Sequence, residues 1–400
     1  MSAPAVPDDR ARPLDGIRVL DFTSMVSGPY CTRLLADMGA TVIKLEPVGG
    51  DLIRGAVPVI QSGSRYFAAF NAGKQSIVVD LKSPEGVEIA RELASRCDVV
   101  VENFRPGVMN KLGLGYESLS ANNPALVYCS ISGFGQDGPM KDWPAYAPIV
   151  HALSGFDHVF TNCQDDPSEP PIAGIQVADV LTGAFAFGAV QSALIKRFRT
   201  GVGDYIDATL IESAMALVTG DLQMPQIETD QRITTFKAVR AKDGWVMPVI
   251  LTEKAFESLC EVIDPSLATD SRFSHRVPRT QHFAELRAAI EAWTSRRSAR
   301  ICQDTLMAAG VPCARYATLE DVLADPHLVA RGTFATLEDS AGSFVVNNAP
   351  FRFRSSDTAI RSGAPKLGEH TATVLAQWLN IDADRLAELA RTGVVSEKVL

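Results

Sequence analysis

Asp179 stands at the start of the most apolar stretch of the chain, which continues from Val180 to Ile195. A stretch of this kind predicts a buried helix, and an aspartate at a helix start commonly serves as the N-cap. The same position also suits a nucleophile, because the dipole at a helix N-terminus keeps a carboxylate ionised. With water excluded, such a carboxylate can attack an acyl carbon and form an acyl-enzyme. Residue type alone favours the cap, and both interpretations stay open.

Two further segments follow predicted strands and offer groups for an anionic ligand. Residues 24–27 (Ser24, Met25, Val26 and Ser27) lead into a predicted helix, whose N-terminus is a natural anion site. The loop lacks a GxGxxG pattern, which argues against a dinucleotide. Asn103, Phe104 and Arg105 combine an amide, an aromatic face and a guanidinium, which suits an adenine with a nearby phosphate. The simpler interpretation of both segments is an ordinary turn after a strand.

Other familiar catalytic arrangements have little support. The chain contains no GxSxG elbow, no HExxH pattern and no CxxC spacing, so neither a serine-hydrolase triad nor a metal site is predicted. The isolated histidines are expected to be structural or solvated, and the scattered cysteines to be reduced thiols of a cytoplasmic protein. The histidines are His151, His158, His275, His282, His327 and His370, and the cysteines are Cys31, Cys97, Cys129, Cys163, Cys260, Cys302 and Cys313.

Composition narrows the class of protein. The chain has 400 residues, 46% of them hydrophobic, and a net charge of -9, which argues against a nucleic-acid partner. The first fifteen residues are polar and proline-rich, unlike a signal peptide. The apolar stretch after Asp179 is shorter than the roughly 18 residues of a membrane span, so no membrane association is expected.

The elements that would position these residues alternate between strand and helix in the N-terminal half. Compact Val, Ile and Leu runs predict strands that are covered on both faces, and the alternation predicts an α/β fold with a doubly wound parallel sheet. The predicted strands are 17–22, 41–45, 76–80, 99–102 and 126–131, and the predicted helices are 29–38, 84–96, 116–121 and 210–222. Residues 139–169 show no regular pattern.

The pattern predicts two domains along the whole chain. Residues 1–222 are predicted to form the first part of a large domain, and residues 223–232 a polar linker. Residues 233–325 are a smaller α/β unit, with a hairpin at Asp243–Gly244 and helices at 254–262, 282–294 and 299–309. A second linker covers 326–340, and 341–400 adds strands at 343–346 and 349–353 and helices at 370–379 and 382–391.

The order and spacing of several motifs resemble the family III CoA-transferases, also called the CaiB/BaiF family. This family includes formyl-CoA:oxalate and carnitine CoA-transferases and the 2-methylacyl-CoA racemases. The resemblance covers nearly the whole chain. The matching segments are 13–21, 34–40, 42–47, 49–51, 70–76, 101–107, 133–139 and 367–371.

The resemblance implies a fold, an assembly and a set of site residues. It implies an interlocked homodimer of two threaded rings, with a Rossmann-like CoA-binding domain built from both chain ends and a small domain from the middle. The substrates would be an acyl-CoA and a small carboxylic acid, with no permanently bound cofactor. Asp179 would be the catalytic aspartate. The residues implied for the CoA site are Ser24, Met25, Val26, Ser27 and Tyr146, with Lys74, Asn103, Phe104, Arg105 and Lys111 at the adenine or phosphates.

Departures from the family pattern bear on the reaction. Racemases of the family carry a histidine base where this chain has Tyr146, and a phenol with a pKa of about 10 is a poor base near neutral pH. Tyr146 therefore favours transfer, through an aspartyl anhydride and an aspartyl-CoA thioester, over racemisation. The glycine-run loop of the formyl-CoA transferases has no counterpart in residues 223–250, which argues against oxalate and formyl-CoA. A racemase and a CoA-binding protein without turnover remain the alternatives.

Overall fold

The computed structural model describes residues 12–60, 63–162, 164, 168–170, 172–228, 236–339 and 342–396. The chain divides into two compact units. One contains Met1–Val159, Pro170–Gly220 and Ala330–Leu400, and the other contains Phe160–Glu169 and Asp221–Val329. Each unit is described by itself.

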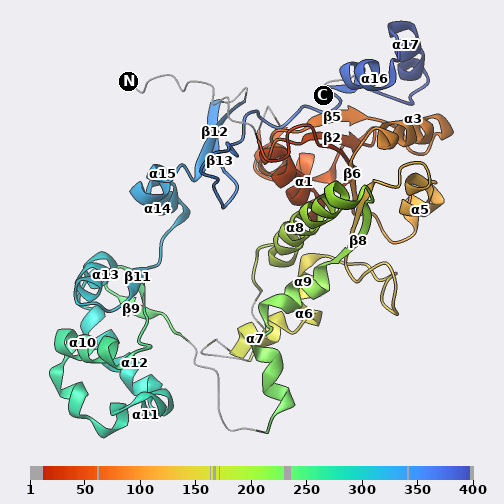
Figure 1. The fold of residues 1–400 in the computed structure, drawn as a ribbon. Helices are drawn as coiled ribbons and strands as arrows, with labels where there is room; N and C mark the ends of the chain where they lie inside the picture. Colours follow the sequence, from red (N-terminus) through yellow and green to blue (C-terminus); the bar gives the residue numbers. More distant parts are fainter. Residues whose placement is uncertain are drawn as a thin grey trace. The chain divides into compact units, whose positions relative to one another are not determined.

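The larger unit is built on a six-stranded parallel sheet, which confirms the predicted α/β class (Figure 1). The strand order is β5-β2-β1-β6-β7-β8. All five predicted strands are present within a few residues of the expected ranges. The strands are β1 (Arg18–Asp21), β2 (Thr41–Glu46), β5 (Gln75–Val78), β6 (Val99–Glu102), β7 (Val127–Ser132) and β8 (Asp204–Thr209).

Alternate side chains of the four central strands, β2, β1, β6 and β7, enter two separate cores, one on each face of the sheet. Val19 of β1 packs into one core, and the next residue, Leu20, packs into the other. This is why the strands are continuous apolar runs instead of alternating ones. The first core is completed by α1 (Ser27–Asp37), α6 (Ala147–Leu153), α8 (Val177–Thr200) and α9 (Leu210–Leu217). The second is completed by α3 (Pro84–Ser95), α4 (Val108–Lys111), α5 (Tyr116–Ser120), α16 (Thr371–Leu379) and α17 (Ala383–Arg391).

The C-terminal part of the chain returns to the N-terminal sheet. The hydroxyl oxygen of Thr371 accepts a hydrogen bond from the backbone N–H of Val78 in β5, and Val395 forms a β-bridge with Val79. Val374 and Leu375 of α16 are buried in the second core. The larger unit therefore includes residues from both ends of the described chain.

Several local predictions differ from the structure. Strand β8 was missed because this edge strand has the sequence DYIDAT, which contains two aspartates and no continuous apolar run, and most of its side chains are half-buried or exposed. Residues 139–169 include two short helices, α6 and α7 (Phe156–Asn162), although no regular pattern was expected there. The helix predicted over 210–222 ends at Leu217, because α9 gives way to a separate 3-10 turn at Asp221–Gln226.

The expected linkers also contain regular structure. The 3-10 turn extends into the 223–232 linker, of which residues 229–232 lie outside the described part, as does Cys163. The 326–340 linker contains α15 (Pro326–Ala330) and β12 (Phe334–Asp339), and its residue 340 is likewise outside. Strand β12 pairs with β13 (Gly342–Asn347), whereas the predicted strand at 349–353 is wrong, because residues 351–353 are irregular. Smaller elements near the sheet are the 3-10 turn Leu52–Gly55, β3 (Val59–Ile60), β4 (Gly63–Ser64) and α2 (Arg65–Asn71).

The smaller unit has its own sheet and core. The hairpin predicted at Asp243–Gly244 is present, since Gly244 pairs with Ala241, and the strand order is β11-β10-β9. Leu259, Ile290 and Leu306 are buried in its core. Its elements are β9 (Val239–Ala241), β10 (Gly244–Pro248), α10 (Glu253–Ile263), the 3-10 turns Pro265–Thr269 and Ser271–Phe273, α11 (Arg276–Gln281), α12 (Phe283–Thr294), α13 (Ala299–Ala308), β11 (Cys313–Arg315) and α14 (Leu319–Ala324).

Helix α8 is the one described helix that is long and apolar enough to cross a membrane by length and composition. One such helix is weak evidence for a span. Ala186, Val190 and Leu194 of α8 are fully buried against the sheet, as in the core helix of a folded domain.

The entry into the edge strand β8 provides a test of the packing. A Cβ at Gly203 would lie 1.9 Å from the carbonyl oxygen of Leu126, so Gly203→Ala should lower the free energy of unfolding by about 1–3 kcal/mol. Gly188 of α8 has open space around it. Gly188→Ala should instead raise the free energy of unfolding by about 0.5–1 kcal/mol, because alanine favours a helix interior. Urea unfolding of both variants measures the two effects. Equal stability of the two variants would contradict this packing at β8.

Candidate active site

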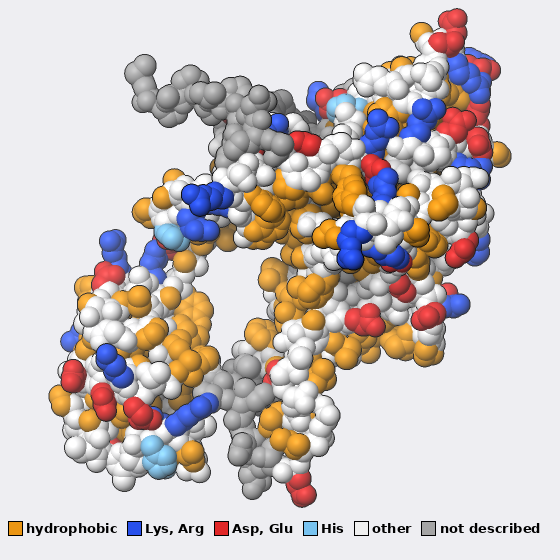
Figure 2. Space-filling view, in the orientation of Figure 1, with side chains coloured by type: hydrophobic (Ala, Val, Ile, Leu, Met, Phe, Trp, Pro, Cys, Tyr) orange, Lys and Arg blue, Asp and Glu red, His pale blue; other side chains and the backbone are white. Residues whose placement is uncertain are grey.

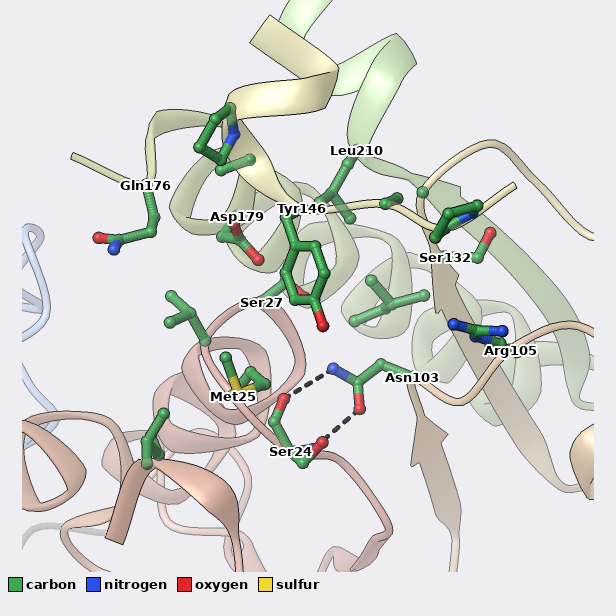
Figure 3. Close-up of a pocket in the computed structure, with 18 of the residues that line it drawn as sticks. Ser24, Met25, Ser27, Asn103, Arg105, Ser132, Tyr146, Gln176, Asp179 and Leu210 are labelled. Atoms are coloured by element: carbon green, nitrogen blue, oxygen red, sulfur yellow. Dashed lines mark hydrogen bonds between the residues drawn. The ribbon is translucent and has the colours of Figure 1, made fainter. Parts of the chain in front are cut away.

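A pocket of about 800 Å³ opens at the carboxyl ends of β1, β6 and β7 in the larger unit (Figure 3). Within the sheet, β1 has β2 as its neighbour on one side and β6 as its neighbour on the other, so the strand order reverses at β1. Ligands of open α/β sheets bind at such a reversal of strand order. The pocket brings together Ser24, Met25, Val26, Ser27, Asn103, Phe104, Arg105, Tyr146 and Asp179 from the predicted site.

The loops after β1 and β6 are joined directly. The backbone N–H of Ser24 donates to Oδ1 of Asn103 at 2.8 Å, and Nδ2 of Asn103 donates to the carbonyl oxygen of Ser24, also at 2.8 Å (Figure 3). Asn103 therefore uses both ends of its amide to hold the neighbouring loop. Two segments that were predicted independently as ligand-binding loops form one wall of the pocket.

A buried ion pair between Lys44 and Asp51 holds the loop after β1. Lys44 Nζ lies 2.9 Å from Asp51 Oδ2 and donates to the carbonyl oxygen of Thr23 at 2.6 Å. Asp51 Oδ1 accepts the backbone N–H groups of Met25 and Ile53, at 3.1 and 3.2 Å. Burial lowers the pKa of Lys44, but the charges of Asp21 and Asp51 outweigh this and raise it. The ion pair thus fixes two pocket-lining segments to each other.

Met25 has a backbone φ of 67°, which is unusual for a residue with a side chain. Such a conformation persists only where its surroundings determine it. The hydrogen bond from its N–H to Asp51 is one such restraint.

Lys74 does not reach the pocket. Its ammonium group is fully buried and donates to Asp21 Oδ2 at 3.0 Å, to the carbonyl oxygen of Pro29 at 3.0 Å and to Asn71 Oδ1 at 2.8 Å. Burial lowers the pKa of Lys74 to about 8, although Asp21 opposes this. The structure therefore gives no support to the predicted phosphate contact, because this cation is used to neutralise Asp21.

The other predicted cations differ in position. Arg105 is exposed and lines the pocket, whereas Lys111 is exposed at the end of α4 and is not among the lining residues. Lys141 lines the pocket and was missed by the sequence analysis. Its place two residues after the 133–139 motif was the available signal.

Asp179 lies in the first turn of α8, whose N-cap is Gln176. The interpretation of Asp179 as the N-cap is therefore wrong, since the N-cap residue, Gln176, lies three residues earlier. Burial raises the pKa of Asp179 to about 6, while its own backbone N–H and the Ser27 hydroxyl oppose the rise by hydrogen bonding. The carboxyl group is thus ionised near neutral pH but poorly solvated, as a nucleophile requires.

Close packing between α1 and α8 brings Ser27 to Asp179. Gly183 lies one turn after Asp179 on α8, and a Cβ at Gly183 would lie only 2.6 Å from the carbonyl oxygen of Ser27. The missing side chain therefore allows the start of α1 to approach the turn that carries the carboxylate.

Two tyrosines flank the carboxylate. Tyr146 is the N-cap residue of α6, and its largely exposed ring projects into the pocket (Figure 3). Burial and then the charge of Asp179 raise the pKa of Tyr66, which also lines the pocket. The Tyr66 hydroxyl donates to Gln176 Oε1 at 3.3 Å. Tyr66 and Gln176 were not identified from the sequence, because neither lies in a recognisable motif.

Metal ligands do not gather in the part of the chain that the structure describes. No group of three or more His, Cys, Asp and Glu side chains there could hold an ion.

Comparison with known proteins identifies relatives over almost the whole chain. The sequence model of CoA-transferase family III matches residues 14–371. The chain is 35% identical to a succinate–glutarate CoA-transferase of Agrobacterium fabrum (94% of this chain, 98% of the relative). It is 32% identical to the succinyl-CoA:glutarate CoA-transferase of Homo sapiens (96% and 90%) and 36% identical to an acetyl-CoA:oxalate CoA-transferase of Acetobacter aceti (92% and 96%).

Solved structures agree with this result. A CaiB/BaiF family protein from Brucella suis superposes with a TM-score of 0.82 at 33% identity, covering 92% of this chain and 100% of the other. A hypothetical protein from Mycobacterium tuberculosis gives a TM-score of 0.81 at 32% identity, with coverage of 91% and 99%.

The raised pKa of Asp179 predicts a specific effect on stability. The folded protein retains this proton up to about pH 6, whereas an unfolded aspartate releases it near pH 4. Stability therefore falls as pH rises between these values, and the loss persists at higher pH. Asp179→Asn avoids the loss and should raise the free energy of unfolding above about pH 7 by at most about 3 kcal/mol, reduced by solvent screening.

Urea unfolding of wild type and Asp179→Asn across this pH range measures the difference. The gain should shrink towards zero near pH 4, where both side chains are uncharged. A gain that is independent of pH would show that ionisation of Asp179 is not its cause.

Proposed function

The chain belongs to family III of the CoA-transferases, and from this premise we propose that it moves CoA from an acyl-CoA donor to a carboxylic acid through covalent intermediates on Asp179. The observation that carries the proposal is the Asp179 carboxyl group. It lines an 800 Å³ pocket together with the loops after β1 and β6, and burial raises its pKa to about 6.

The first half-reaction transfers CoA to the enzyme. The Asp179 carboxylate attacks the thioester carbonyl of the donor and expels CoA thiolate, which leaves a mixed anhydride between the aspartate and the acyl group. The thiolate then attacks the aspartyl carbonyl of the anhydride. This step releases the donor acid as a carboxylate and leaves CoA bound to Asp179 as a thioester.

The second half-reaction reverses these steps with another acid. The acceptor carboxylate attacks the aspartyl thioester, releases the thiolate and forms a second anhydride. The thiolate attacks the acceptor's carbonyl, which yields the new acyl-CoA and frees the Asp179 carboxylate. Both anhydrides are hydrolysable, so the pocket must exclude water during turnover.

The pocket supplies complementary groups for the two ends of the substrate. Arg105 and Lys141 provide positive charge for the phosphates of CoA, and Phe104 provides an aromatic face for its adenine. Asn103 shapes this part of the pocket through its two hydrogen bonds to Ser24. The Ser27 hydroxyl and the N–H groups at the start of α1 are the donors proposed to stabilise the developing oxyanions.

We propose small dicarboxylic acids as substrates. Two relatives are named for succinate or succinyl-CoA together with glutarate. Oxalate is disfavoured by the missing glycine-run loop, although two relatives are named for it. Racemisation is disfavoured by Tyr146, which lines the pocket and whose phenol is a poor base at neutral pH.

We further propose a cytoplasmic enzyme that is an interlocked homodimer and does not associate with membranes. The outer face of α8 exposes large apolar side chains, among them Phe185 (48% exposed), Ile195 (59%) and Phe198 (69%). Figure 2 shows hydrophobic side chains gathered on the visible face of the larger unit around this helix. A second copy that covers this surface would remove it from water.

The covalent step predicts a mass change. Mixed with succinyl-CoA and no acceptor, the wild-type protein should gain the mass of CoA less water, measured by intact-protein mass spectrometry. Hydroxylamine should remove the adduct and leave a hydroxamate on Asp179. Asp179→Asn should show no adduct, because an amide cannot form the anhydride.

Asp207→Asn is the matched control for this experiment. Burial also raises the pKa of Asp207, but this residue is not among those that line the pocket. The control variant should retain the adduct. Turnover of Asp179→Asn near the wild-type rate, with deamidation excluded, would overturn the mechanism. A panel of acyl-CoA donors and acids then identifies the substrates.

Interlocking predicts a dimer that does not dissociate on dilution. Threaded rings separate only through substantial unfolding, so mass photometry at nanomolar concentration should still detect the dimer alone. Sedimentation at increasing urea concentrations should show dissociation together with loss of structure. A reversible, concentration-dependent monomer under native conditions would argue against threading.

A further inference from the structure

His151 provides a hydrogen-bond acceptor to the helical turn that carries Asp179. His151 lies in α6, is 4% exposed, and its Nε2 accepts the backbone N–H of Ala178 at 3.1 Å. Ala178 is the residue immediately before Asp179. In the sequence His151 is one of six isolated histidines, because its partner is 27 residues away.

The backbone donors of this first turn have separate acceptors. The N–H of Val177 donates to the carbonyl oxygen of Ile175 at 2.9 Å, and that of Val180 donates to the carbonyl oxygen of Gln176 at 3.1 Å. The N–H of Asp179 is hydrogen-bonded to its own carboxylate. Gln176 makes no side-chain cap, so the N–H of Ala178 depends on His151.

The hydrogen bond requires a neutral imidazole with its proton on Nδ1, because a protonated ring has no acceptor. Burial lowers the pKa of His151, although the charge of Asp157 opposes this. The imidazole also packs against the Phe156 ring, with 5.1 Å between centroids. The ring is therefore held from two sides in the form that can accept the Ala178 N–H.

Helix α6 contributes to the pocket at its other end. Tyr146 is its N-cap residue, and Tyr146, Ala147 and Pro148 all line the pocket. His151 itself does not line the pocket. One short helix thus carries a wall of the pocket and the side chain that holds the start of α8.

We propose that His151 is a positioning residue, which fixes the first turn of α8 against α6 and so sets the direction in which the Asp179 carboxylate meets the thioester. This inference rests on the proposed function of Asp179. It assigns no contact between His151 and the substrate.

Two variants separate the acceptor from the bulk of the side chain. His151→Leu keeps the bulk of the side chain but removes the hydrogen-bond acceptor, whereas His151→Gln keeps a neutral acceptor. The first readout is the single-turnover rate constant for the CoA adduct on Asp179 with succinyl-CoA. The Leu variant should lose at least tenfold in this rate with its KM for succinyl-CoA within about twofold of wild type, because only the direction of attack changes. The Gln variant should recover most of the rate.

The second readout does not depend on catalysis. Amide hydrogen exchange across Val177–Val180, followed by mass spectrometry, should accelerate in the Leu variant and return towards wild type in the Gln variant. Thr294→Val is the matched control, because it removes a buried hydroxyl that donates to the carbonyl oxygen of Arg240 in the smaller unit. The control should lower the melting temperature while leaving both readouts unchanged.

The dependence on pH keeps the inference testable if the Leu variant does not fold. Of the elements packed against α6, α7 carries Asp157 and His158, and α9 carries Glu212, which is bonded to Thr209. Helix α8 carries Asp179 in its first turn and Lys196, Arg197 and Arg199 near its other end. Both proteins need an ionised Asp179, but only wild type also needs a neutral His151. Lowering the pH until the His151 imidazole is protonated should slow wild type more than the Gln variant. The ratio of the Gln rate to the wild-type rate should therefore rise at least twofold at low pH.

The outcomes are distinguishable. Absence of an adduct in wild type would contradict the proposed function. A wild-type adduct rate in the Leu variant, equal losses in the Leu and Gln variants, or a Gln-to-wild-type ratio that does not change with pH would each overturn the role of His151.

Discussion

Four buried charged side chains hold the loop between β1 and α1, and the pocket depends on them. Lys44 pairs with Asp51, Lys74 pairs with Asp21, and none of the four side chains is more than 1% exposed. Removing one partner would leave an uncompensated charge in the protein interior, which costs about 3–5 kcal/mol. These ion pairs are weak evidence for overall stability, but their hydrogen bonds give the loop one geometry. Lys44 binds the carbonyl oxygen of Thr23, and Asp51 binds the N–H of Met25.

The walls of the site are connected through this loop. Asn103 joins it to the end of β6, Asp51 joins it to the segment that contains Ile53, and Gly183 lets α8 approach at Ser27. The side chain of Asp179 therefore faces a surface whose parts restrain one another. Such restraint lowers the reorganisation needed when the substrate binds.

The sequence contained enough information for the sheet and for part of the site. Strands such as Val99–Glu102 are short apolar runs that can be recognised from neighbouring residues alone. Asp179 was singled out by its place at the start of the apolar stretch and by the resemblance of the whole chain to the family. The contacts of Lys74 and His151 could not be predicted, because their partners Asp21 and Ala178 are 53 and 27 residues away. A lysine that binds a phosphate and a lysine that neutralises a buried aspartate look the same in one sequence. Strand β8 was missed because its two aspartates interrupt the apolar run that marks the central strands.

The hydrogen bond between Thr371 and Val78 joins residues 293 positions apart, and this separation affects how the protein is made. At the ribosome, about 15–60 s pass between synthesis of β5 and of α16, because chains grow at about 5–20 residues per second. During that interval one face of the nascent sheet, including Leu20, Ile43 and Ile77, lacks the C-terminal helices that cover it in the finished protein. Until its last helices emerge, the growing chain must therefore leave this face of the sheet incompletely packed, or a chaperone must shield it.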